Sequence, residues 1–187
     1  MKKIPIRQLI SPQQELPTIE RFKIRRVEDI LGDHDLMHDL HRHDFFFILA
    51  LKKGTGRHEI DFVEYRVLDN SLFIIRPGQV HQLELNASCT GYLVEFNNEF
   101  YHPKDKSSNL RLRKASNKNY CELEVNRFNK LHAVLSLMFE ENAAREEGYQ
   151  DVIKSSLDIF FIEFVRQSSN PKEESIIINP YTQERFE

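Results

Sequence analysis

This sequence of 187 residues has only two cysteines, no long apolar run and no excess of positive charge. The two cysteines, Cys89 and Cys121, lack metal-binding or redox spacing, so we expect reduced thiols and no disulfide. No segment approaches the roughly 20 apolar residues of a membrane span, and the N-terminus lacks the apolar stretch of a secretion signal. With 29 acidic and 26 basic residues, the net charge of −3 gives no electrostatic case for nucleic-acid binding by this chain. These absences predict a cytoplasmic protein with no membrane partner.

Between positions 44 and 96 the sequence contains short segments rich in Phe, Ile, Val and Tyr, which is typical of β-strands. Glycine, Asp-Asn and the Pro77-Gly78 pair separate these segments and favour tight turns. Short strands with turns at this spacing indicate an antiparallel sandwich or barrel.

The flanking segments have different patterns. Residues 1–40 contain helix-breaking prolines and one alternating stretch, which predicts an N-terminal arm and a first strand. Residues 41–100 are the predicted β-barrel, and the polar residues 101–121 are a predicted mobile connection. Within residues 122–168, helices over about 125–146 and 150–167 with a break at Gly148 predict an antiparallel hairpin. Residues 169–187 have the composition of a linker.

Histidine is concentrated in one part of the chain, because six of the eight histidines lie between positions 34 and 81. Side chains alternate across a strand, so one face is predicted to present His41, His43, Phe45, Phe47 and Leu49. Two interpretations are open: the histidines are hydrogen-bonded at a strand end, or they line a pocket. For the histidines we favour a pocket, because polar groups at a barrel mouth cost free energy unless they meet water or a ligand. For the phenylalanines we favour ordinary core packing.

The stretches "HRHDFFFILALKKG" and "LDNSLFIIRPGQVHQLE" resemble the paired motifs of the cupin jelly roll. His41 and His43 match the His-x-His element, Gly54 matches the glycine, and His81 matches the histidine of Pro-Gly-x-x-His. The position of the carboxylate is occupied by Phe47. The resemblance implies three histidines and one glutamate on Fe, Mn, Ni or Zn in a metal cupin. Because the anionic ligand is missing, we expect no metal and no cofactor, although three imidazoles alone can hold zinc.

The order of the segments is similar to the N-terminal sensor half of AraC-type bacterial transcription regulators. This resemblance implies a cupin jelly roll followed by a helical hairpin, hence a fold that is mainly β with α. It further implies a small-molecule effector, a homodimer, and contact with DNA only through a C-terminal domain absent from this chain. The candidate ligand-binding residues are His41, His43, Phe45, Phe47, His58, Arg76, His81 and Tyr92. The assignments of Arg76, His58 and Tyr92 rest on weaker arguments from charge and burial.

Two alternatives to a sensor remain. A small metal-dependent cupin enzyme, an oxygenase or isomerase, would use His41, His43 and His81 as ligands; we predict a non-enzyme because of Phe47. An orphan binding protein complete at 187 residues differs from the sensor only in having no second half.

The first predicted helix carries apolar residues over roughly 240° of its surface, more than the ~100° stripe that one packing partner needs. We therefore predict a homodimer through this helix. The alternative is that the second helix covers the whole excess. The predicted dimerisation residues are Phe128, Leu131, Val134, Leu135 and Met138.

Overall fold

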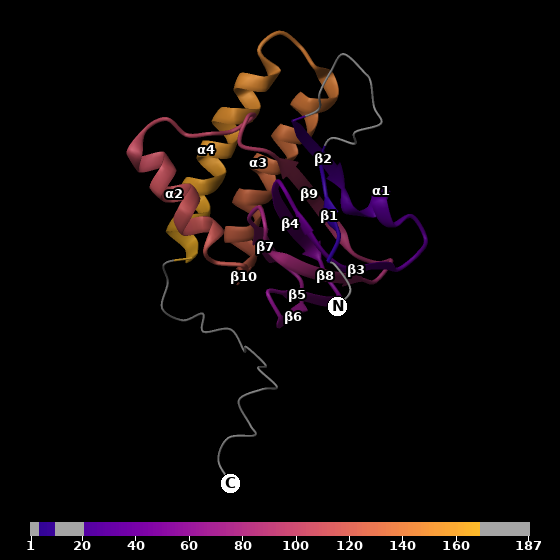
Figure 1. Ribbon diagram of the computed structural model, residues 1–187. Coiled ribbons are helices and arrows are strands. Elements are labelled where there is room, and N and C mark those ends of the chain that lie inside the picture. The colour runs from indigo at the N-terminus through magenta and orange to yellow at the C-terminus, as the bar shows by residue number, and fades with distance from the viewer. Residues whose placement is uncertain (1–3, 10–20, 169–187) are drawn as a thin grey trace, which may run out of the picture.

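The computed structural model describes residues 4–9 and 21–168, and these form two stacked five-stranded sheets with the three longest helices on one side (Figure 1). The first sheet has the order β1-β3-β8-β5-β6 and the second β10-β7-β4-β9-β2. All neighbouring strands are antiparallel except β1 and β3, which run parallel. The cupin-type β-sandwich predicted from the sequence is therefore present.

The strands of the first sheet are β1 (Ile6–Arg7), β3 (Leu36–His43), β8 (Val80–Leu85), β5 (Gly56–Ile60) and β6 (Val63–Val67). Those of the second are β10 (Tyr120–Glu122), β7 (Ser71–Ile75), β4 (Phe46–Lys53), β9 (Thr90–Phe96) and β2 (Phe22–Arg26). The helices are α1 (Val27–Leu31), α2 (Lys106–Ser116), α3 (Val125–Ala144) and α4 (Tyr149–Ser168).

The position of strand β4 between two buried layers explains why its sequence is a continuous apolar run and does not alternate. Phe47 and Leu49 face the interior between the two sheets, whereas Phe46 and Ile48 face the helices on the other side. Both faces of the strand are buried, and a strand with two buried faces needs apolar residues at every position. This strand therefore separates the interior of the sandwich from the helical layer.

The helical hairpin forms as predicted, with α3 and α4 packed on the outer face of the second sheet (Figure 1). The predicted dimerisation surface, however, is wrong for four of its five residues. Phe128, Leu131, Leu135 and Met138 are fully buried inside the chain's own core, where they pack with α4 and the sheet. The fifth residue, Val134, is partly buried against the same core. The second helix and the sheet together cover the apolar excess, which was the alternative interpretation.

Residues 101–121 also differ from the mobile connection that the sequence indicated. They contain the helix α2 and the start of the edge strand β10. The Asp105 carboxylate accepts a hydrogen bond from the Ser108 amide at 2.8 Å and begins the helix. The helix buries only a short, small-residue stripe, with Leu112 and Ala115 in the core, so its apolar periodicity is weak in the sequence. The predicted linker at 169–187 and part of the arm lie outside the described residues.

Candidate functional site

The His-x-His element lies at the end of β3, next to the corner where the chain crosses from one sheet to the other. His41 and His43 are two residues apart, so both point into the interior, where each is at most 4% exposed. The Pro77-Gly78 corner holds this end of the strand, because the Gly78 amide donates a hydrogen bond to the His43 carbonyl at 2.8 Å. Gly78 has a φ of +89°, which favours glycine.

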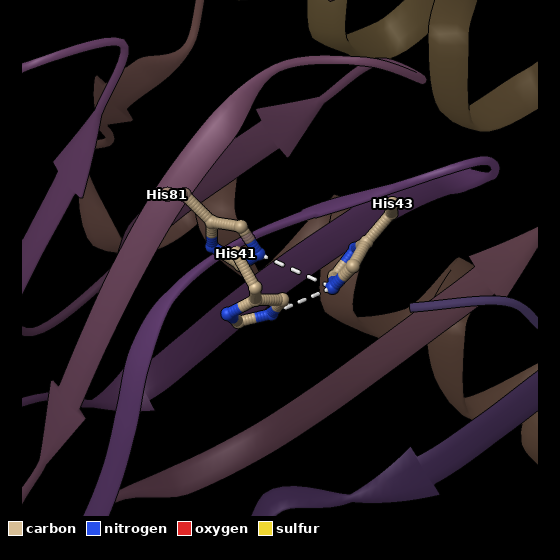
Figure 2. Close-up of side chains that lie close together, drawn as sticks. All are labelled: His41, His43 and His81. Atoms are coloured by element: carbon tan, nitrogen blue, oxygen red, sulfur yellow. Dashed lines mark hydrogen bonds between the residues drawn. The ribbon is translucent and has the colours of Figure 1, made fainter. Parts of the chain in front are cut away.

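His81 joins this pair from the neighbouring strand β8, where it lies directly opposite His41 in the antiparallel register. The Nε2 atom of His43 is 2.8 Å from His41 Nε2 and 3.2 Å from His81 Nε2. Figure 2 shows the three rings turned toward one another, with both contacts meeting at His43. The two sequence motifs, 38 residues apart from His43 to His81, therefore meet at one point inside the sandwich.

His58, on β5, extends this cluster on the far side of His81. Its Nε2 atom is 2.9 Å from His81 Nδ1, and its side chain is fully buried. Both ring nitrogens of His81 are thus in contact with another imidazole. The weak candidate His58 is therefore a direct neighbour of the motif histidines.

His38 is a residue of this region that the sequence analysis did not select. Residues 38 and 41 of a regular strand point to opposite faces, but β3 has a bulge between them. His38 pairs with Leu83 and His41 with His81, so β3 has two residues between these pairs where β8 has one. Both histidines therefore face inward. Their rings are in edge contact with centroids 5.8 Å apart. Only the bulge reveals this, because alternation alone predicts the opposite.

Burial keeps these histidines neutral. Desolvation is the largest cause of each shift and lowers the pKa of His43 and of His58 to about 3, and that of His38 to about 4. The pKa values of His41 and His81 are lowered by the same cause. The additional repulsion between neighbouring rings acts in the same direction for His43, His58 and His81. The interior therefore holds a cluster of neutral imidazoles, each with one nitrogen lone pair.

Aromatic rings surround the cluster. Phe45 is stacked on His43 with centroids 4.3 Å apart, and Phe47 lies 5.4 Å from His43 and 5.2 Å from His81. Phe73 contacts His58 at 4.7 Å, a neighbour that the sequence analysis did not select. Phe47 thus stands beside the imidazoles at the position where the cupin motif has a carboxylate.

Two predicted pocket residues are not part of this cluster. Tyr92 lies on the opposite face of the second sheet, where its ring contacts His132 and Phe139 of α3. The Arg76 guanidinium is exposed and donates a hydrogen bond to the Asn117 side chain at 2.6 Å. Tyr92 therefore belongs to the helical core and not to the pocket, and Arg76 ties the Pro-Gly corner to the residue that ends α2.

A cavity of about 380 Å³ lies between the arm and the second sheet, and Phe45, which stacks on His43, forms part of its wall. Gln8, Leu9, Lys23, Arg25, Phe45 and Glu95 line it. Arg25 and Glu95 form an ion pair at 2.9 Å, and the Lys23 ammonium donates a hydrogen bond to the Leu9 carbonyl. This cavity is therefore polar and is bounded in part by the N-terminal arm.

The cupin fold implies a metal, and the three motif histidines fit one. Among the described residues, one nitrogen from each of His41, His43 and His81 lies within 4.8 Å of the others. Three donor atoms of one tetrahedral zinc ion, bound at 2.0–2.1 Å, stand roughly 3.4 Å apart, and the two contacts observed are 2.8 and 3.2 Å. Neutral imidazoles are the form that binds metal. The expectation of no metal rested on Phe47 alone and is not tested by this geometry.

In the described part of the chain, no helix has the length and apolar character to span a membrane.

Comparison with known proteins finds that residues 30–117 match the family model described as AraC-like ligand binding domain. This match confirms the AraC-type resemblance that the order of the segments indicated. A search of curated protein sequences finds no significant match.

The solved structures similar to the chain include an AraC-like activator, a cupin protein and a third protein, all of low sequence identity. The AraC-like transcriptional activator CuxR has 14% identity and a TM-score of 0.46; the match covers 72% of this chain and 46% of that one, so this chain spans less than half of its length. A cupin protein from Bacteroides fragilis has 16% identity and a TM-score of 0.29, covering 47% of this chain and 86% of that one. The plu4264 protein from Photorhabdus luminescens has 14% identity and a TM-score of 0.28, covering 54% and 88%.

Proposed function

We propose, from the match of residues 30–117 to the AraC-like ligand binding domain family, that the chain is the effector-sensing and dimerisation part of a cytoplasmic transcription regulator. In this proposal the chain itself is not an enzyme, and DNA is bound by a further domain. The family match carries the proposal. The buried histidine cluster supports it, because polar rings inside a β-sandwich cost free energy unless they meet a partner or a ligand.

The effector site in this proposal is the sandwich interior around His41, His43, His58 and His81, with Phe45 and Phe47 as its apolar walls. Two structural connections lead from it. The arm strand β1 pairs with β3 beside His43, where Arg7 and His43 are partners in the ladder. Strand β4 carries Phe47 toward the histidines and Phe46 and Ile48 toward α3 and α4. A shift at the cluster therefore changes contacts of both the arm and the hairpin.

Dimerisation in this proposal uses the outer surface of the hairpin rather than the face predicted from the sequence. Leu137 of α3 is 43% exposed and Ile159 of α4 is 50% exposed. Exposed apolar side chains on adjoining helices are typical of an association surface, and a two-fold dimer is the commonest way to cover one.

Thermal unfolding of the chain across a panel of metabolites tests effector sensing. A bound effector at 100 times its dissociation constant stabilises the folded chain by about 2.7 kcal/mol, which raises the melting temperature measurably. The stabilisation should disappear in His81→Ala. If no compound stabilises the wild-type chain, or if His81→Ala responds as the wild type does, the site is wrong.

The convergence of His41, His43 and His81 favours a second candidate, a metal-dependent cupin enzyme. This function predicts that the metal-loaded chain consumes one compound of the same panel with turnover. Mass spectrometry after incubation separates the two, because a sensor binds its effector and leaves it unchanged. Catalytic loss of a compound that stops in His41→Ala would favour the enzyme.

A further inference from the structure

We propose that His58 is a positioning residue for a metal site: it accepts the Nδ1 proton of His81 and thereby turns the Nε2 lone pair of His81 into the cluster. The ion is one divalent transition metal of the class that prefers imidazole, such as Zn²⁺ or Co²⁺. Its ligands are His41, His43 and His81. This inference goes beyond effector sensing and does not depend on it.

The first step is the tautomer of His41. Its Nδ1 atom lies 2.6 Å from the Asp39 carbonyl oxygen, and a carbonyl oxygen only accepts hydrogen bonds. The Nδ1 atom of His41 therefore carries the proton. In a neutral ring this leaves a lone pair on Nε2, and that atom is the one that faces His43.

The second step is a count of protons at His43. Its Nε2 atom has two nitrogen neighbours, at 2.8 Å and 3.2 Å, and a ring nitrogen carries at most one proton. Since His41 Nε2 has none, at most one of the two contacts is an ordinary hydrogen bond: either His43 donates to His41, or His81 donates to His43. In the second arrangement the lone pairs of His41 and His43 face each other at 2.8 Å and repel. A cation between three lone pairs engages all three nitrogens at once.

The third step is the role of His58. Its Nε2 atom and His81 Nδ1 are 2.9 Å apart, so one of the two donates. If His81 donates, its Nε2 keeps a lone pair for the ion; if His58 donates, His81 Nε2 is protonated and cannot bind. The other nitrogen of His58, Nδ1, is buried and has no hydrogen-bond partner within the described ranges, so no third group fixes the tautomer of His58. This is how an outer residue orients a metal-binding histidine.

The surroundings define the class of ion. The ligands are imidazole nitrogens, which suit Zn²⁺, Co²⁺, Ni²⁺ and Cu²⁺ better than Mg²⁺ or Ca²⁺. Phe47 occupies the place of the motif's carboxylate and contacts two of the rings. The site therefore has three protein ligands, the number found in zinc sites that keep a position open.

Titration of the metal-free chain with Co²⁺, followed by visible absorption and by Zn²⁺ competition, tests the proposal. We expect one ion per wild-type chain and none in His81→Ala. His58→Leu should bind roughly 10- to 100-fold more weakly, because nothing accepts the His81 proton. His58→Gln should bind within a few-fold of wild type, because its amide oxygen accepts that proton. The exposed His102→Ala is the control and should bind as wild type.

Circular dichroism of each metal-free variant separates loss of binding from loss of fold. Long-range proton–nitrogen NMR of the zinc-loaded wild type gives an independent result that needs no variant. It should show the His81 proton on Nδ1; a proton on Nε2 overturns the positioning role. Wild-type affinity in folded His58→Leu overturns it as well. A wild-type chain that takes up neither Co²⁺ nor Zn²⁺ overturns the metal site, whereas the thermal stabilisation by an organic effector would be unaffected.

Discussion

His58 and His81 lie on neighbouring strands, with the His58 Nε2 atom 2.9 Å from His81 Nδ1 and both side chains buried. His81 in turn contacts His43 through its other nitrogen. The central ring of the cluster therefore has both of its polar atoms engaged by other histidines. Any change at His58 is transmitted to the ring that joins the two sequence motifs.

Acid should destabilise the chain in the absence of metal. The unfolded histidines have a pKa near 6.5, whereas burial lowers the folded values of His43 and His58 to about 3. Below pH 6.5 the unfolded state therefore binds more protons, and stability falls as the pH drops toward 3. Each such histidine contributes a slope of up to about 1.4 kcal/mol per pH unit.

Urea denaturation between pH 7.5 and pH 5 in a chelating buffer measures this slope. His58→Leu removes one of the depressed groups and should reduce the slope by about one proton. A free energy of unfolding that stays constant over this range would show that the histidines titrate normally in the folded chain.

Phe47→Ala should lower the free energy of unfolding by about 3–5 kcal/mol, because the ring is buried between the sheets and its removal leaves a cavity. The measurement is urea denaturation at pH 7.5. Phe62 is the matched control: it is 65% exposed, and Phe62→Ala should change stability by less than about 0.5 kcal/mol. Equal effects of the two substitutions would mean that Phe47 is not part of the core.

His81→Ala and Arg76→Ala should separate the cluster from the nearby surface. Loss of His81 should abolish stabilisation by whichever compound of the metabolite panel stabilises the wild type. Arg76→Ala should leave it unchanged, because the Arg76 side chain is exposed and pairs with Asn117. Thermal unfolding reports both. A response that depends on Arg76 and not on His81 would move the effector site to the surface.

The oligomeric state can be measured by light scattering at micromolar concentration. We expect a mass of about twice 22.2 kDa for the wild type and a monomer for Leu137→Lys with Ile159→Lys. Both side chains are exposed, so the double variant should remain folded. A wild-type mass near 22.2 kDa rejects the dimer, and a dimer that survives both substitutions rejects this surface.

Local patterns in the sequence determined the class of fold and the central histidines. Strand alternation placed His41 and His43 on one face, and the Pro77-Gly78 corner placed His81 at the start of a strand, because both depend on a few neighbouring residues. The helical hairpin was equally predictable, since its apolar periodicity lies within each helix. The short helix α2 was not predictable, because few of its residues are buried and most of the others are polar or charged.

Contacts between distant segments were decided only by the tertiary structure. The bulge in β3 turned His38 inward against the alternation rule, and the pairing of β5 with β8 brought His58 to His81. Tyr92 lies on the helical side of the second sheet. The sequence did not reveal this, because both faces of that sheet are buried and apolar. Burial of Phe128 and Leu131 followed from how α4 and the sheet cover α3. Strand register, the order of the layers and the burial of helix faces depend on packing between elements. The pattern of one segment does not show which other segment it packs against.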